Sequence, residues 1–247
     1  MLDANVTTWK RIWQKKSDRS NSIHANSNKK SLLAKLIEID GFDSKVGFVG
    51  EDSWLEYVGH VKDHLRVPTK GAILEVGCGA GAFLLPFSVE GIVDIFGVDY
   101  TAELIDIARD VMPAGTFKVA EANAIPFGDN IFDAVVSNGV FYYFPDHQYA
   151  EKSILEMVRV LKPGGVSAIL DISDLNLKQE AEDLRASEIG VEEFNRLYTS
   201  IGLTHLYFDR KWFASFSKEH GLELLIEDQT IAGYQNAKYR FNVYLKK

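Results

Sequence analysis

The sequence predicts an α/β fold with a doubly wound, mostly parallel sheet of seven strands that ends in an antiparallel C-terminal strand. Five short apolar runs alternate with helical segments between residues 72 and 172. Two further strand-like segments near the C-terminus are separated by only about ten residues, too few for a crossover helix, so they should pair in antiparallel fashion. The chain has 247 residues, of which 46% are hydrophobic, and can therefore bury a full core.

The elements follow one another in a regular order. A helix is predicted over residues 51–65, where apolar residues recur at helical spacing. The predicted parallel strands are the apolar runs 72–76, 94–98, 116–120, 132–137 and 166–172. The predicted crossover helices are 80–90, 101–112 and 147–161. Strands joined in this way indicate a sheet that is covered by helices on both faces.

The C-terminal part departs from this alternation. Residues 174–210 form a charged helical insert after the fifth strand. A short helix, "WFASFSKEHG", then precedes the two closing strands, "LELLIEDQT" and "YRFNVYLKK". We expect residues 1–66, the N-terminal arm and helices, to form part of a lid, and residues 67–247 to form the main domain.

Composition narrows the possible functions. No run approaches the roughly 18 apolar residues of a membrane helix, and the N-terminus lacks the apolar segment of a signal peptide, so we expect a cytoplasmic protein. The single cysteine, Cys78, excludes an intrachain disulfide. Residues 1–36 hold eight Lys/Arg and two acids, which leaves a net charge of −14 on the remainder. An acidic body argues against extended nucleic-acid binding.

Three glycines occupy alternate positions directly after the first predicted strand, in "ILEVGCGAGAF" (73–83). Gly77, Gly79 and Gly81 tolerate dihedral angles that other residues avoid, and they let a ligand approach the backbone. Open α/β sheets bind ligands at the carboxyl ends of their strands, and the helix behind the loop would offer N–H groups to an anionic group. This loop therefore predicts a ligand-binding site at that sheet edge.

The glycines alone do not identify the ligand. The segment "GCGAGA" (77–82) also fits the dinucleotide fingerprint, and Asp99 lies about 20 residues further on, where a ribose-binding acid belongs. Glu75 favours another ligand, because a carboxylate beside the loop repels a pyrophosphate and attracts an ammonium or a sulfonium. An NAD(P)-dependent oxidoreductase is the alternative interpretation.

The segment "ILEVGCGAG" resembles motif I of the class I S-adenosylmethionine (SAM) dependent methyltransferases. Four further segments resemble features of this family in the family's order: "FGVDY", "AEANAIPF", "NIFDAVVSNGVFYYF" and "RVLKPGG". The resemblance implies a Rossmann-like sheet with an antiparallel final strand. It also implies that residues 67–247 form a SAM-binding methyltransferase domain and that the cofactor is SAM.

The resemblance implies roles for individual residues. The three glycines would line the methionine and ribose portions of SAM, and Glu75 would help to hold the amino-acid end. Asp99 would accept both ribose hydroxyls, since a carboxylate has two oxygens suited to a vicinal diol. The other expected contacts are Tyr100 against the adenine ring, Glu121 and Ala122 at the adenine amino group, and Ser137 and Asn138 near the methionine.

Fewer signals point to the catalytic residues. Holding the nucleophile and the methyl carbon in line can provide most of the acceleration, and a base is needed only if the acceptor must lose a proton. The candidates for that base are Asp171, near the end of the fifth strand, His147 and His205. Tyr142 is a candidate for the wall of the acceptor pocket, together with Tyr143.

A metal site is not expected. His60 and His64 have the i, i+4 spacing that can pair two imidazoles on one metal ion, but no third ligand is evident near them in the sequence. We therefore interpret this pair as part of a solvated helix face.

The predicted function is methyl transfer by in-line displacement from SAM to a hydroxyl or amine of a small-molecule acceptor, a sugar or a secondary metabolite. The (D/N)-P-P-(Y/F/W) signature of amino-methylating DNA and RNA enzymes is absent after the fourth strand, where "SNGVFYY" stands. We therefore predict neither a nucleic-acid nor a membrane partner. The other alternative is a catalytically inactive SAM-binding module, whose cleft over residues 137–143 would be obstructed.

Overall fold

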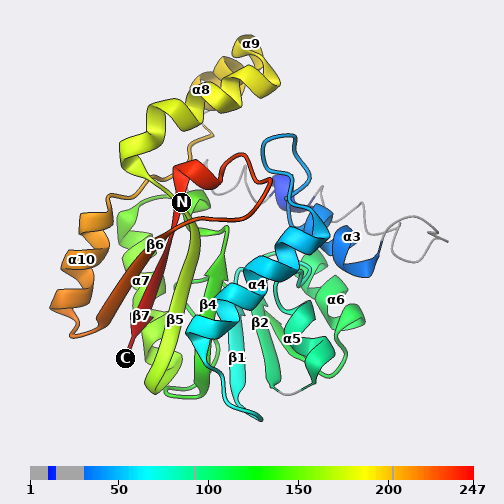
Figure 1. Cartoon of the computed structure of the whole chain (residues 1–247), viewed down its shortest axis with the longest axis vertical. Helices are drawn as coiled ribbons and strands as arrows, with labels where there is room; N and C mark the ends of the chain where they lie inside the picture. The colour runs from blue at the N-terminus through cyan, green and yellow to red at the C-terminus, as the bar shows by residue number, and fades with distance from the viewer. Residues whose placement is uncertain (1–10, 15–30, 92, 202) are drawn as a thin grey trace.

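A seven-stranded sheet of order β3-β2-β1-β4-β5-β7-β6 forms the centre of the computed structural model, which describes residues 11–14, 31–91, 93–201 and 203–247 (Figure 1). The first five strands pair in parallel. Their bounds are Ala72–Val76 for β1, Asp94–Asp99 for β2, Thr116–Val119 for β3, Phe132–Asn138 for β4 and Leu161–Ser173 for β5. The strand order reverses between β1 and β4, which opens a crevice at their carboxyl ends.

The C-terminal strands confirm the predicted antiparallel ending. β7 (Arg240–Lys246) lies between β5 and β6 (Glu223–Asp228) and runs antiparallel to both. Because β7 lies between two strands, both of its edges are hydrogen-bonded. Its residues from Arg240 to Leu245 are buried. The fold class predicted from the sequence is therefore confirmed.

Helices cover both faces of the sheet. One face packs against α3 (Leu32–Ile39), α4 (Glu51–Leu65), α5 (Leu85–Glu90) and α6 (Ala102–Val111), and the other against α7 (His147–Val160) and α10 (Arg210–Glu219). Figure 1 shows α4 lying across the sheet. Its apolar residues other than the exposed Leu55 face the core, as their spacing predicts; they are Trp54, Tyr57, Val58, Val61 and Leu65.

The first crossover helix starts later than the sequence predicts. Residues 77–84 form an irregular loop, and α5 begins only at Leu85. Pro86 then lies in the first turn, where its missing N–H has no helical partner to lose. The expected helix over 80–90 is therefore shorter, and the proline accounts for the difference.

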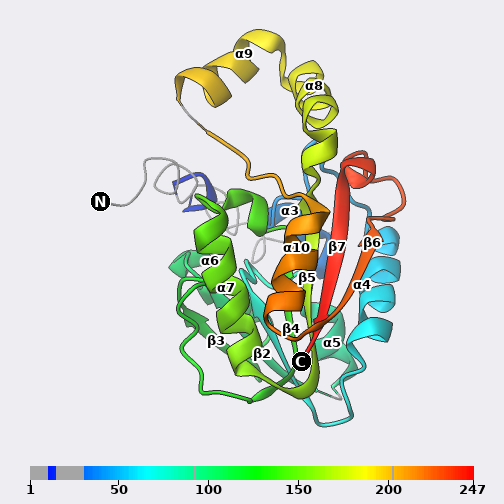
Figure 2. The same cartoon turned by 90° about the vertical axis from the view of Figure 1, so that its left-hand side faces the viewer.

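The predicted insert is helical and stands beyond the carboxyl edge of the sheet (Figures 1 and 2). It contains α8 (Lys178–Ile189), α9 (Val191–Asn195) and the π-helical turn η4 (Arg196–Ser200). Its two ends meet, because the N–H of Phe208 donates to Ser173 O at 2.9 Å and the N–H of Leu175 donates to Phe208 O at 2.9 Å.

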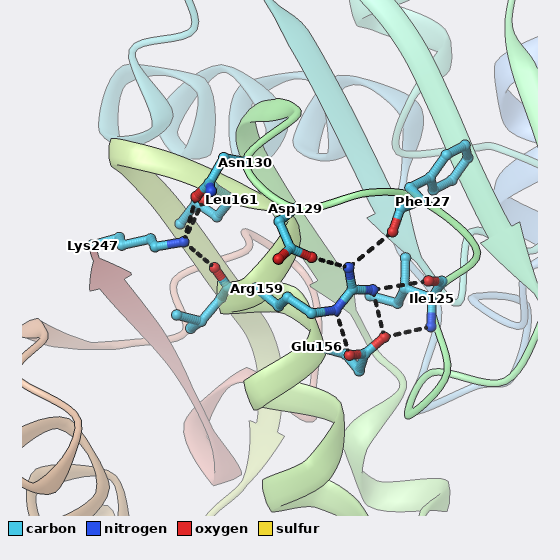
Figure 3. Close-up of polar contacts among 9 residues, drawn as sticks. Ile125, Phe127, Asp129, Asn130, Glu156, Arg159, Leu161 and Lys247 are labelled. Carbon is cyan, nitrogen blue, oxygen red and sulfur yellow. Dashed lines mark hydrogen bonds and ion pairs between the residues drawn. The ribbon is translucent and has the colours of Figure 1, made fainter.

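A polar cluster around Arg159 fixes the loop that leads into β4 (Figure 3). The guanidinium donates to the carbonyl oxygens of Ile125, at 3.0 Å, and Phe127, at 2.9 Å. It also binds the carboxylates of Asp129, at 2.7 Å, and Glu156, at 2.6 Å. Four partners from α7 and the loop therefore hold residues 125–129 in one arrangement. Among the described residues, no helix has the length and apolarity that crossing a bilayer requires.

Candidate functional site

The glycine loop after β1 has the backbone that its residue types predict. Gly77, Gly79 and Gly81 have φ values of +76°, +52° and +96°. A Cβ atom at Gly77 would overlap the side chain of Val140, and one at Gly79 would overlap Asp40. Glycine is therefore required at these positions both for the left-handed conformation and for the close approach of neighbouring groups.

The N–H groups of this loop already have carboxylate partners. Asp40, the residue after α3, accepts from the N–H of Ala80 at 2.6 Å and from that of Ala82 at 2.9 Å. Asp99 accepts from the N–H of Gly79 at 3.0 Å. We expected these donors to be available to an anionic ligand group. Two side-chain carboxylates bind them instead. Asp40 was not predicted at this site, because it lies about 40 residues before the loop in the sequence.

Asp99 ends β2 and is 7% exposed. Its second oxygen accepts from the N–H of Thr101 at 2.8 Å, so two backbone bonds fix the orientation of the carboxylate. Burial raises the pKa of Asp99, while these two bonds lower it. Each oxygen retains a lone pair that can accept from a hydroxyl group, which suits a vicinal diol.

Glu75 is the most isolated carboxylate of the site. It is 3% exposed, and its Oε2 has no hydrogen-bond partner among the described residues. Burial raises the pKa of Glu75 well above its usual range, and the charges of Asp40 and Asp99 raise it further. Such a group is costly unless a cation or a donor satisfies it, so it fits the ammonium of a bound amino-acid moiety.

These residues line one cleft, which we call the donor cleft. It encloses about 980 Å³, including its open mouth, which is enough for a nucleoside-sized ligand. Of the expected contacts, it is lined by Glu75, Gly77, Gly79, Asp99, Tyr100, Glu121, Ala122 and Asn138. Ser137 is fully buried and Gly81 packs against Met112, so neither is among the residues that line the cleft.

The wall at the expected adenine end is partly aromatic. The hydroxyl of Tyr149, from α7, donates to Glu121 Oε2 at 2.8 Å and fixes that carboxylate. At the other end, the hydroxyl of Tyr57 donates to Asn138 Oδ1 at 2.9 Å, which leaves the amide nitrogen of Asn138 for a ligand. Tyr149 was not predicted, because its contact joins elements that are separate in the chain.

The donor cleft is strongly acidic. Four carboxylate side chains line it, and none of the described lining residues is Lys, Arg or His. The acidic residues are Asp40, Glu75, Asp99 and Glu121. A cationic ligand is attracted to this site, and a pyrophosphate is repelled.

A second cavity adjoins the donor cleft and shares Asp40, Phe42 and Tyr143 with it. Its other walls come from the loop of residues 41–47, the 3₁₀ turn η2 (Phe141–Tyr143), the insert, and the segment from Tyr234 to the start of β7. Its polar and aromatic lining includes Tyr142, Arg185, Tyr198, His205, Tyr234 and Arg240. This arrangement gives a ligand in the donor cleft a neighbouring site for a reaction partner.

The candidate catalytic residues are distributed unequally. Tyr142 and His205 line the second cavity. Asp171 is fully buried and accepts from the hydroxyl of Tyr234 at 2.9 Å, and it lines neither the donor cleft nor the second cavity. His147 lies at the start of α7, with its Nε2 atom 3.2 Å from Tyr207 O. It also lines neither the donor cleft nor the second cavity.

The histidine pair on α4 has a neighbour that the sequence did not reveal. Glu227 of β6 places its Oε2 3.2 Å from the Nε2 atoms of both His60 and His64. The three groups lie close enough together to hold an ion. They equally satisfy one another, with both imidazoles directed at one carboxylate oxygen.

Comparison with known proteins agrees with this geometry. Residues 74–169 match the model of a family described as "Methyltransferase domain". The chain is 37% identical over 110 residues to "Probable tRNA methyltransferase 9B" of Bos taurus, which covers 42% of this chain and 22% of that protein. It is 30% identical over 101 residues to "Demethylmenaquinone methyltransferase" of Renibacterium salmoninarum, covering 41% of each. The chain therefore spans less than half the length of these relatives.

Solved structures share the fold. A protein from Pyrococcus horikoshii superposes with a TM-score of 0.62 at 17% identity, covering 85% of this chain and 97% of that one. A chain from the complex between the Haloferax volcanii Trm112 methyltransferase activator and a methyltransferase gives a TM-score of 0.60 at 17% identity, covering 79% and 91%. A SAM-dependent methyltransferase from Thermotoga maritima gives 0.58 at 16% identity, covering 96% and 99%.

One prediction needs correction. We predicted a small-molecule acceptor and no nucleic-acid partner, from the acidic body and the missing signature. The first three relatives, from Bos taurus, Homo sapiens and Mus musculus, are all named as probable tRNA methyltransferases, at 35–37% identity. Net charge reports on non-specific attraction to polyanions, and it does not exclude a nucleic-acid substrate. That exclusion was wrong.

Family model, fold and acidic cleft agree with the resemblance seen in the sequence. Residues 74–169 of the chain match a methyltransferase domain, and the fold agrees with the class I SAM-dependent methyltransferases that the sequence resembles.

Proposed function

We propose that this chain transfers the methyl group of SAM to an oxygen or nitrogen nucleophile that reaches the donor cleft from the second cavity. The charge of the donor cleft carries this proposal. Four acidic and no basic side chains among its described lining residues favour a donor with a sulfonium and an ammonium group. The unpartnered Oε2 of Glu75 is a ready acceptor for the ammonium.

The residues of the chain would act mainly by positioning. Asp99 holds the ribose, Glu121 and the backbone at Ala122 face the adenine, and Glu75 faces the amino-acid end. When bound, SAM supplies an electrophilic methyl group on sulfur. The protein then has to exclude water and to hold the acceptor in line, which can lower a barrier by up to ~7–11 kcal/mol in favourable cases.

The two alternative functions lose support. A dinucleotide would place its pyrophosphate against loop N–H groups that Asp40 and Asp99 already occupy. A catalytically inactive module would have its cleft obstructed over residues 137–143. Instead, Asn138, Gly139, Val140 and Tyr143 line the donor cleft, and Tyr143 also lines the second cavity.

The names of the relatives support a nucleoside of tRNA as an acceptor. The likeness that supports it covers 42% of the chain, and the second cavity lies partly in the insert, outside the matched residues 74–169. Radiolabelled SAM incubated with bulk tRNA tests this point. Label that is recovered in a nucleoside after the RNA is digested supports a tRNA acceptor. Unlabelled RNA beside labelled low-molecular-weight acceptors contradicts it.

The donor is tested by calorimetry with SAM, S-adenosylhomocysteine and NAD side by side. We expect saturable binding of the first two compounds and none of NAD. A clear NAD isotherm without SAM binding would overturn the proposed function.

A further inference from the structure

Arg240 is a buried guanidinium whose hydrogen-bonding capacity the protein uses only in small part. It begins β7 and is 6% exposed. It donates to the hydroxyl of Ser173 and lies over the ring of Tyr142, 4.3 Å from its centroid. Among the described residues, no carboxylate forms an ion pair with it. A guanidinium carries several N–H donors, and a buried charge is costly without a partner.

Asp171 supplies the main counter-charge, which raises the pKa of Arg240 against the effect of burial. Asp171 interacts with Arg240 through space, but its carboxylate accepts from the hydroxyl of Tyr234 and does not line the second cavity. Burial raises the pKa of Asp171, while the charge of Arg240 lowers it. Arg240, in contrast, does line the second cavity.

A second guanidinium lines the same cavity. Arg185 of α8 is half-buried and lies over the ring of Tyr198, 5.3 Å from its centroid, and it forms no ion pair with the described residues. The two acids of the cavity are engaged elsewhere. Asp40 binds the N–H groups of the glycine loop, and Glu188 accepts from the N–H of Val46 at 3.0 Å.

His205 adds no positive charge to this wall. It lies among the rings of Tyr142, Tyr143 and Tyr198, with centroids 5.3, 5.7 and 5.7 Å away. Burial lowers the pKa of His205 well below its usual range, and the two arginines lower it further. The imidazole is therefore neutral, and the positive charge of the cavity wall comes from the two arginines.

We propose that the second cavity binds the methyl acceptor through an anionic group, a carboxylate or a phosphate, held by Arg240 and Arg185 between tyrosine rings. This inference rests on the proposed function, and it names the chemical class of the acceptor. The residues shared with the donor cleft, Phe42 and Tyr143 among them, place the nucleophile of such an acceptor next to the donor. Arginine suits this task because its planar fork binds carboxylate or phosphate in bidentate fashion.

Binding of matched probes tests the proposal. Benzoate and phenyl phosphate, with benzamide as the uncharged counterpart of benzoate, are titrated by calorimetry into the full chain saturated with S-adenosylhomocysteine. We expect benzoate or phenyl phosphate to bind at least about tenfold more tightly than benzamide. Whichever anion binds more tightly indicates a carboxylate or a phosphate as the natural group. Equal affinity for benzamide, or no binding of either anion, would overturn the proposal.

Variants show whether the two arginines are responsible. Arg185→Gln should weaken binding of the anionic probe about tenfold and leave affinity for SAM unchanged. Arg196→Gln is the matched control, because Arg196 lies in the same insert, is exposed and pairs only with Glu193. Arg240→Lys preserves the buried positive charge but removes the planar guanidinium. It should also weaken binding of the anionic probe while the chain remains folded.

Failure of this inference can be separated from failure of the proposed function. If SAM binds and Arg185→Gln leaves the benzoate and phenyl phosphate affinities unchanged, the anionic acceptor is refuted and the SAM assignment stands. If SAM does not bind at all, the proposed function fails, whichever way the probes behave.

Discussion

The carboxylates of the donor cleft couple its affinity for a cation to pH. Burial and the charges of Asp40 and Asp99 raise the pKa of Glu75 in the empty protein, and a bound ammonium lowers that pKa again. Binding therefore releases a proton in the pH range of the raised pKa. Affinity for SAM should fall as the pH drops through that range and level off above it.

Calorimetry of SAM binding between pH 5 and 8, in buffers of different ionisation enthalpy, measures this proton release. Glu75→Gln should bind SAM more weakly and with a flatter pH profile, while Glu219→Gln, an exposed glutamate of α10, should behave as the parent chain. A parent affinity that is constant across this range would show that Glu75 does not face the bound cation.

Asp99 has two functions that one substitution can separate. Its carboxylate ties Thr101 and the glycine loop together and is also expected to bind the ribose. Asp99→Asn keeps the size of the side chain but presents an N–H group to backbone donors. We expect SAM affinity to fall more than about tenfold and the free energy of unfolding to fall by about 1–3 kcal/mol. Calorimetry and urea unfolding measure the two effects, and unchanged affinity would refute the ribose assignment.

Single residues also show where the sequence was and was not informative. Glu75, Asp99 and two of the three glycines were predicted at the cleft because they lie next to strand ends, whose position follows from the chain. Asp40 and Arg240 were not predicted. The contact of Asp40 with the loop spans 40 residues, and Arg240 stands in an ordinary strand pattern whose burial depends on β7 lying between β5 and β6.

At the scale of elements, the local sequence predicted whether a segment is a helix or a strand better than it predicted where that segment begins and ends. α4 was predicted with its observed bounds because its apolar spacing ends at a charged turn. α5 was predicted too long, because the apolar residues from Ala82 to Leu84 are compatible with a helix, whereas Pro86 marks the actual start. β5 extends to both sides of the apolar run, since its partners β4 and β7 continue to pair with it.

Arg159 makes the loop before β4 dependent on α7. Arg159→Gln removes charge-assisted bonds to the carbonyls of Ile125 and Phe127 and should lower the free energy of unfolding by about 1–3 kcal/mol. Urea unfolding at pH 7 measures this loss. Arg196→Gln, which breaks only an exposed ion pair, should change stability by less than about 0.5 kcal/mol.

The same variant should alter the acid sensitivity of the protein. The Arg159 side chain lowers the pKa of Glu156, so the parent gains stability above the unfolded-state pKa of a glutamate and loses it as the pH falls through the lowered value. The difference in stability between parent and Arg159→Gln should therefore shrink from pH 7 to pH 3. A difference that stays constant would show that Glu156 does not depend on Arg159.

At the scale of the whole molecule, different parts of the chain form the donor cleft and the second cavity. The acidic donor cleft comes mainly from strand ends and their loops, whereas the arginines of the second cavity come from α8 and β7. The methyltransferase-domain match was predictable because the donor cleft is encoded in contiguous motifs. The second cavity was not, because it forms where the insert, η2, β7 and the loop of residues 40–47 meet.

This division predicts the effect of shortening the insert. Phe208 and Ser173 are hydrogen-bonded, as are Leu175 and Phe208, so the ends of the insert already lie together and a short Gly-Ser linker can replace residues 178–203. Among the described residues of this segment only Ala181 and Leu203 are buried apolar residues, so the core of the sheet should be little affected. We expect the shortened chain to bind SAM within about twofold of the parent while its affinity for benzoate or phenyl phosphate falls at least about tenfold.

Calorimetry with both ligands, alongside urea unfolding, distinguishes the outcomes. Lost SAM affinity in a folded chain would show that the insert belongs to the donor cleft. Retained affinity for the anion would show that Arg185 and its helix do not form the second cavity.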